Sequence, residues 1–172
     1  MNNNKIAETF AKGKTSGRGS NMFISGDTIY SYGHHFPIAI RTTPELQRAI
    51  GKKYIFNMNG YSNSTAKHKN HVACALGYSN YIEVPNCDVS KTGLERFLNK
   101  IKMKEINLWE TKLKSLKTKN GARAKGYQKK IDAGKEKYNT YENLMYNIYG
   151  GNSIKLIKSL AKELKGELEF AG

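Results

Sequence analysis

The chain has 172 residues, of which 38% are hydrophobic and eleven are tyrosine, so it can form one domain, or one domain with an appendage, around a modest core. Its 29 Lys and Arg residues against 14 Asp and Glu residues give a net charge of +15, which favours a polyanionic partner and excludes an acidic mimic of nucleic acid. No apolar run approaches the length of a membrane span and residues 1–20 hold no hydrophobic signal core, so we expect a cytoplasmic protein without a membrane partner.

Residues 1–20 are predicted to be a flexible basic N-terminal arm. A short helix is expected around Ile6 to Ala11, followed by a stretch of Gly, Ser and basic residues that is typical of a mobile segment. Residues 21–86 are predicted to form an antiparallel sheet with one packed helix. Its strands are expected at 22–25, 28–32, 36–41, 53–58 and 81–84, and a short helical turn at 43–50.

The packed helix is predicted from Ser64 to Leu76, with Ser62 or Ser64 as its N-cap and Gly77 as its end. The dipeptide Gly26-Asp27 between the first two strands is typical of a two-residue hairpin turn. The two cysteines, Cys74 and Cys87, have no metal-binding or disulfide spacing, and we expect both to be reduced and buried.

Residues 87–172 are predicted to be helical. Two long helices, from 91 to about 117 and from about 122 to 148, are separated by a break at 119–121 and should form an antiparallel hairpin. A last helix is expected from Asn152 or Ser153 to Lys165. The apolar stripes of the two hairpin helices are expected at Leu94, Phe97, Leu98, Ile101, Leu108, Trp109, Leu113 and Leu116, and at Tyr127, Ile131, Tyr138, Tyr141, Leu144 and Met145.

The predicted hairpin carries much of the positive charge. Between residues 100 and 137, thirteen basic residues outnumber four acidic ones, and residues 112–130 contain no acid at all. Lysines can lie along phosphates and gain affinity by counterion release, without reading the base sequence. We therefore predict a nucleic-acid-binding surface formed by Lys112, Lys114, Lys117, Lys119, Arg123, Lys125, Lys129 and Lys130. The alternative is a solvated helical surface whose charge only prevents aggregation.

All four histidines fall in two short stretches, 31–39 and 59–71. The second stretch covers the start of the predicted packed helix, where free backbone N–H groups and the helix dipole favour an anion. This placement predicts a phosphate site formed by Ser64, Thr65, Lys67 and His68. The alternative is an ordinary N-cap with surface histidines.

His35 and His68 are the candidate catalytic residues if the chain is an enzyme, because histidine can move a proton near neutral pH. Neighbouring hydroxyls would then suit a metal-independent nuclease. A metal site is not predicted, because adjacent residues of an extended chain point to opposite faces, so His34 and His35 should not both point inward. No cofactor is expected.

The stretches Ser31-Tyr-Gly-His-His-Phe-Pro-Ile-Ala39 and Tyr61-Ser-Asn-Ser-Thr-Ala-Lys-His68 resemble a family of small proteins from phages and other mobile elements. That family shares an S-Y-G-x-H-F-P-I-A strand and a Y-S-x-S-T-x-x-H helix start. His35, Tyr61, Ser62, Ser64, Thr65 and His68 match the pattern, whereas His34 falls at its variable position. The resemblance covers about residues 16–75 and implies an origin in a phage or mobile element, without an activity.

The sequence thus predicts an α+β protein that binds DNA or RNA largely without sequence preference. One alternative is a metal-independent nuclease or another phosphate-processing enzyme. A second is an inhibitor that docks on a host enzyme or a protein–RNA defence complex. This inhibitor would bind stoichiometrically and tolerate salt better than simple phosphate contacts do.

Overall fold

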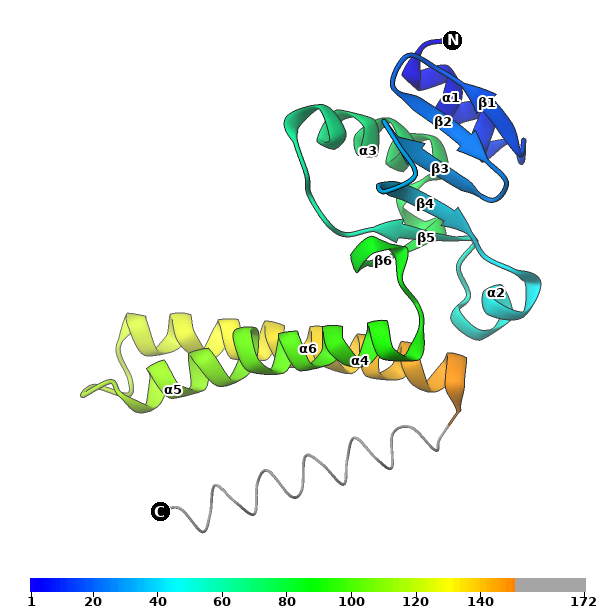
Figure 1. The fold of residues 1–172 in the computed structure, drawn as a ribbon. Coiled ribbons are helices and arrows are strands. Elements are labelled where there is room, and N and C mark those ends of the chain that lie inside the picture. The colour runs from blue at the N-terminus through cyan, green and yellow to red at the C-terminus, as the bar shows by residue number, and fades with distance from the viewer. Residues whose placement is uncertain (151–172) are drawn as a thin grey trace. The chain divides into compact units, whose positions relative to one another are not determined.

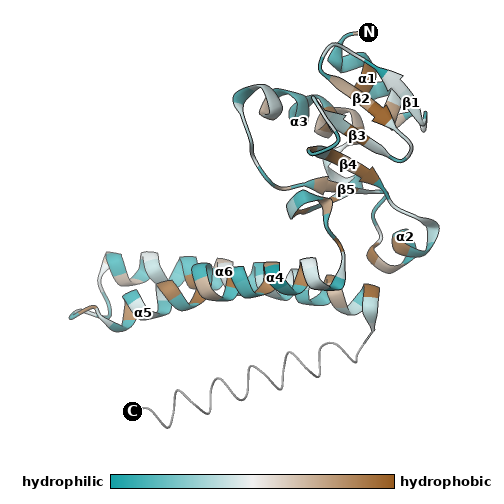
Figure 2. Cartoon of the chain, in the orientation of Figure 1, coloured by the Kyte–Doolittle hydropathy of each residue, from teal (hydrophilic) through white to brown (hydrophobic). Residues whose placement is uncertain are grey.

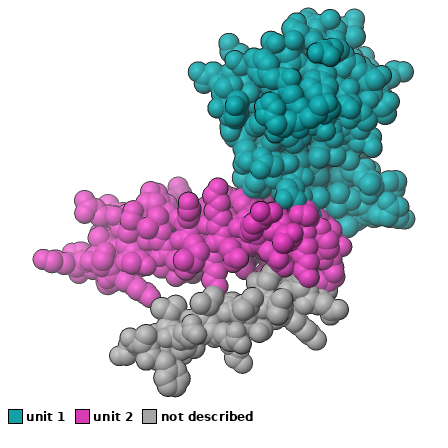
Figure 3. Space-filling view, in the orientation of Figure 1, with its two compact units in different colours: residues 1–89 teal, residues 90–172 magenta. Residues whose placement is uncertain are grey.

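The fold is described from a computed structural model, in which residues 1–150 are defined. The chain divides into two compact units, Met1–Val89 and Ser90–Gly172, close to the boundary expected at residue 87 (Figure 3). Within residues 1–150, no helix combines the length and the apolar character that crossing a membrane requires. The α+β class predicted from the sequence is confirmed.

The first unit contains a six-stranded sheet whose strands follow one another in chain order (Figure 1). Neighbouring strands are antiparallel except for the last two, which are parallel because a helix connects them. The predicted hairpin turn is present, and Gly26 takes a positive φ of 59° there. The strands are β1 (Ser16–Arg18), β2 (Met22–Ser25), β3 (Thr28–Ser31), β4 (Pro37–Arg41), β5 (Tyr54–Asn57) and β6 (Tyr81–Val84).

Two helices, α1 (Asn3–Ala11) and α3 (Asn63–Leu76), contribute to the core of the first unit. Their apolar side chains pack with one face of the sheet, whose apolar strands β2 and β4 are brown in Figure 2. The central members are fully buried, which stabilises the fold by removing apolar surface from water. They include Ile6, Phe10, Met22, Ile29, Ile38 and Val72.

The prediction that residues 1–20 form a flexible arm is wrong, because this segment is part of the sheet unit. Its helix α1 is buried at Ile6, Ala7 and Phe10, and β1 pairs with β2. Arg41 fixes the segment further, since its Nη2 donates to the carbonyl oxygens of Phe10 at 2.7 Å and Lys14 at 2.6 Å. These are long-range contacts that the glycine-rich composition does not reveal.

Short elements complete the first unit. Helix α2 (Pro44–Ile50) lies within the predicted helical turn at 43–50, with Thr43 as its N-cap and Gly51 as its C-cap. The turns η1 (Tyr78–Asn80) and η2 (Pro85–Cys87) flank β6. Both cysteines are free, but only Cys87 is buried, so the expectation that Cys74 is buried is wrong.

The second unit is the predicted helical hairpin. One arm runs through α4 (Lys91–Ile101), the π-helical turn η3 (Lys102–Asn107) and α5 (Leu108–Lys114), and the other is α6 (Ala122–Tyr149). Figure 1 shows the two arms side by side. The last helix expected from residue 152 or 153 to Lys165 lies outside the described residues.

The π-helical turn corrects the predicted apolar stripe. A π-helix closes its hydrogen bonds over one residue more than an α-helix, so the stripe changes phase across it. Ile106 becomes buried, whereas Leu108, predicted to face inward, is 44% exposed. Gly134 of α6 packs directly against this turn, where a Cβ at its position would lie 3.1 Å from the Glu105 carbonyl oxygen.

Candidate functional site

The end of the hairpin, residues 112–130, forms a continuous acid-free segment that we call the acid-free end. It comprises the last turn of α5, the connection and the first two turns of α6. Every one of the eight cations predicted to bind nucleic acid has an exposed side chain. Among residues 1–150, no carboxylate forms an ion pair with any of them.

Three of these cations also contact the hairpin itself. The Nζ atoms of Lys112 and Lys130 lie 4.4 and 3.8 Å from the centre of the Trp109 ring. Lys119 donates to the carbonyl oxygens of Leu113 and Lys114, at 3.3 and 2.9 Å, and thereby caps α5. Among residues 1–150, the other five cations form no such contact, and they are Lys114, Lys117, Arg123, Lys125 and Lys129.

Two carboxylates of the hairpin, both outside the acid-free end, form ion pairs with lysines of α6. Glu105 accepts a hydrogen bond from Lys137 at 2.7 Å, and Glu110 lies 3.1 Å from Lys135. These pairs leave neighbouring basic residues locally neutralised. The positive potential of the hairpin is therefore concentrated at its end, where backbone phosphates can reach several cations at once.

The two histidine-containing stretches come together in the first unit. A hydrogen bond of 2.7 Å joins Ser31 Oγ to His68 Nδ1, and the ring of Tyr32 lies 5.2 Å from that of His68. The rings of His35 and Tyr61 lie 6.4 Å apart. We refer to Ser31, Tyr32, His35, Tyr61 and His68 as the histidine cluster. Ser31 ends β3, Tyr32 and His35 lie in the β3–β4 connection, and Tyr61 and His68 come from the segment before α3 and from its second turn.

His68 is the buried centre of this cluster, with only 4% of its surface exposed. Burial lowers the pKa of His68 from its usual value of 6.5, and the nearby His71 lowers it further. Both effects disfavour the imidazolium, so the ring is neutral at physiological pH. Its Nδ1 can then donate a hydrogen bond to Ser31 Oγ or accept one from it, depending on the tautomer. Tyr32 takes a positive φ of 60°, an unusual conformation for a non-glycine residue.

The four residues predicted to bind phosphate are divided in the structure. Ser62, and not Ser64, is the N-cap of α3, and its Oγ accepts from the backbone N–H of Thr65 at 3.2 Å. Thr65 and His68 are buried and hydrogen-bonded within the protein. Ser64 and Lys67 are exposed. Phosphate binding at this helix start stays a prediction.

Histidines 34 and 35 diverge, as expected, although they lie in a turn and not in a strand. The ring of His34 contacts Phe23 and Tyr30 at 4.9 and 4.8 Å, whereas that of His35 approaches Tyr61. Within residues 1–150, no three His, Cys, Asp or Glu side chains are arranged to hold a metal ion.

The sheet face opposite α1 and α3 carries a row of side chains that was not predicted from the sequence. Arg18 pairs with Phe23, and Phe23 pairs with Tyr30, across β1, β2 and β3. The signal was present in the alternation of β2 and β3, which buries Met22, Ile24 and Ile29 on one face and so directs Phe23 and Tyr30 to the other. We call Arg18, Phe23, Tyr30 and His34 the aromatic row.

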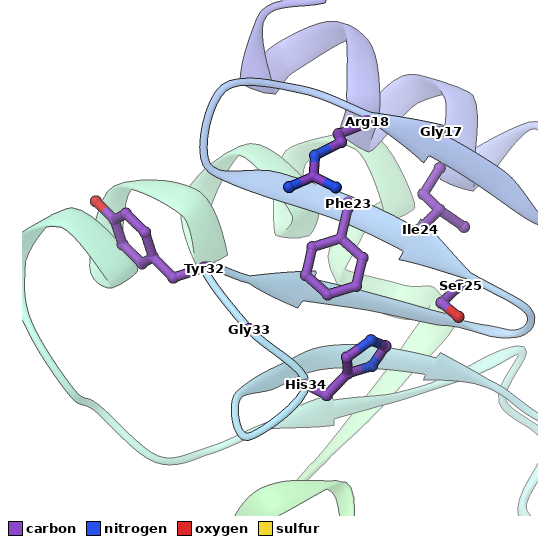
Figure 4. A pocket seen from close by; sticks show the side chains of 8 residues that line it. All are labelled: Gly17, Arg18, Phe23, Ile24, Ser25, Tyr32, Gly33 and His34. Carbon is purple, nitrogen blue, oxygen red and sulfur yellow. The ribbon is translucent and has the colours of Figure 1, made fainter.

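A hollow of about 620 Å³ lies beside this row, and Arg18, Phe23 and His34 are among its lining residues (Figure 4). Ser25 and the backbone around Gly33 form other parts of its wall. Figure 4 shows the side chains of Phe23 and His34 near one another on the face of the sheet, with Arg18 next to Phe23.

No family model matches the chain, and neither a curated protein nor a solved structure does.

Proposed function

We propose that this protein binds nucleic acid, largely without sequence preference, and that the acid-free end of its hairpin provides most of the affinity. One observation supports this proposal above the others. Eight cations within nineteen residues are exposed, and no carboxylate among residues 1–150 pairs with them. A surface that needed charge only for solubility would gain nothing from this segregation of acids and bases.

The composition of the acid-free end favours phosphate over base contacts. Seven of its eight cations are lysines, which act as flexible point charges, and only Arg123 can form bidentate contacts. Each phosphate contact releases counterions, so log K should fall with log salt by about 0.9 per contact on duplex DNA. The motif resemblance supports a setting in a phage or another mobile element.

Binding can be measured through Trp109, the single tryptophan of the chain. Two cations of the acid-free end, Lys112 and Lys130, contact its ring, so bound nucleic acid should change its fluorescence. We expect binding of duplex DNA, single-stranded DNA and RNA that weakens steeply with salt and leaves the nucleic acid intact. Absence of binding at low salt would contradict the proposal and favour a protein partner.

A second candidate function is cleavage of the bound nucleic acid without metal. The observation that favours it is the convergence of His68, Ser31, Tyr32, His35 and Tyr61 in one cluster. Breakdown products formed in the presence of EDTA would support cleavage. His35→Ala is the variant of choice, because His35 is exposed and its loss should remove cleavage without unfolding the chain.

A further inference from the structure

The aromatic row has a geometry that the packing of the core does not require. Its members lie on three adjacent strands and the following turn, in cross-strand register. The Phe23 and Tyr30 rings are stacked at 5.1 Å with an interplanar angle of 17°, and the His34 ring meets both edge-on. Phe23 and Tyr30 are only half-buried, and Arg18 and His34 are exposed, so this apolar surface remains accessible to a ligand.

The chemistry of the hollow suits one kind of occupant. Of the described residues that line it, Arg18 is cationic, His34 is titratable and none is acidic. Aromatic rings beside a guanidinium match a nucleotide, whose base has a π face and whose phosphate is anionic. Duplex DNA cannot present this pair of groups at once without exposing a base, whereas a single strand can.

We propose that the hollow binds an unpaired nucleotide of single-stranded nucleic acid, with the base against Phe23 and His34 and an adjacent phosphate on Arg18. This inference rests on the proposed function and extends it, because it gives the protein a preference for single strands. The acid-free end would contact phosphates of either form, whereas the hollow would distinguish base-bearing single strands. Tyr30 supports the Phe23 ring from the neighbouring strand.

The test compares an oligo-dT strand with an abasic strand that carries the same number of phosphates. The full chain should bind oligo-dT about 5- to 150-fold more tightly, as expected for stacking of a base on an aromatic side chain. Phe23→Leu keeps an apolar side chain in the sheet but removes the ring, and should abolish most of this difference. His34→Ala, at an exposed turn position, tests the same contact with little risk to folding.

Tyr78→Leu is the matched control, because Tyr78 is 68% exposed, lies in η1 and does not line the hollow. It should keep the full preference for oligo-dT. Equal binding of the two strands by the unmodified chain, or a preference that survives both Phe23→Leu and His34→Ala, would overturn this inference alone. Failure to bind either strand or duplex DNA would overturn the proposed function, and this inference with it.

Discussion

The two units of the chain use polar residues in different ways. The first unit, with ten basic and five acidic residues, buries several polar side chains in specific hydrogen bonds. Ser31, Asn57, Thr65 and His68 are all buried there. The hairpin unit carries nineteen basic and nine acidic residues, and its described buried side chains are apolar apart from one tyrosine hydroxyl.

This difference indicates a division of roles. A buried polar group that loses its hydrogen-bond partner costs free energy. Buried polar networks therefore favour the one backbone arrangement in which every group is paired. Exposed lysines specify no arrangement, but they attract any polyanion. We therefore expect substitutions of the buried polar residues of the first unit to affect mainly stability and substitutions at the acid-free end to affect mainly affinity.

The largest effect on stability is expected for Arg41→Ala. Its guanidinium donates to the carbonyl oxygens of Phe10, Lys14 and Gly26 and lies 4.2 Å from the centre of the Phe10 ring. Loss of these charged hydrogen bonds should lower the free energy of unfolding by about 3 kcal/mol in urea denaturation.

Hydrogen exchange should show the loss of protection first in residues 1–18. Arg48→Ala is the control, because that exposed side chain only meets Glu45 at 3.5 Å, and it should change stability by less than about 0.5 kcal/mol. Equal effects of the two variants would mean that Arg41 does not anchor the N-terminal segment.

In the hairpin unit, Gly134→Leu should destabilise by about 2 kcal/mol, because a side chain must displace the π-helical turn that Gly134 contacts. Gly126 provides the matched control on the same helix, since nothing lies within 4 Å of its Cβ position. Gly126→Leu should instead stabilise by up to about 1 kcal/mol through helix propensity. Thermal unfolding, monitored by circular dichroism, compares the stability of the two variants. Similar changes in both would argue against close packing at Gly134.

A smaller effect concerns pH. The folded-state pKa of His68 lies below its usual value of 6.5 because of burial and of His71, so below about pH 6.5 the unfolded chain binds a proton that the folded chain does not. The free energy of unfolding should therefore fall as the pH is lowered through this range, and His68→Gln should reduce that slope. Urea denaturation at pH 7.5 and pH 5.0 measures this change in the free energy of unfolding. An unchanged slope in the variant would show that His68 does not cause the pH dependence.

Much of the fold follows from local sequence patterns. Gly26-Asp27, Pro44 and Gly51 each place a turn or a helix end where the structure has it. The errors arose where distant residues decide the outcome. The segment 1–20 is flexible by composition, but Arg41 and the edge of β2 hold it in place.

The candidate sites were predictable to different degrees. The acid-free end is visible in the sequence because charge segregation is a local property. The histidine cluster could be suspected from two stretches, but their contact depends on how α3 packs beside the β3–β4 connection. The aromatic row was missed because it requires the register of three strands, which brings Arg18, Phe23 and Tyr30 together.

The most direct test of the central claim is a triple variant, Lys114→Gln, Lys117→Gln and Lys125→Gln, compared with a triple variant that removes the same charge from the first unit. The second variant is Lys5→Gln, Lys12→Gln and Lys53→Gln, which replaces exposed lysines of the sheet unit. Both should be titrated with duplex DNA over a salt series. We predict that the hairpin variant loses affinity and that its salt slope shrinks by about 2.7, while the control changes little. Equal losses in the two variants would contradict the account, because they would show that net charge, and not the acid-free end, determines binding.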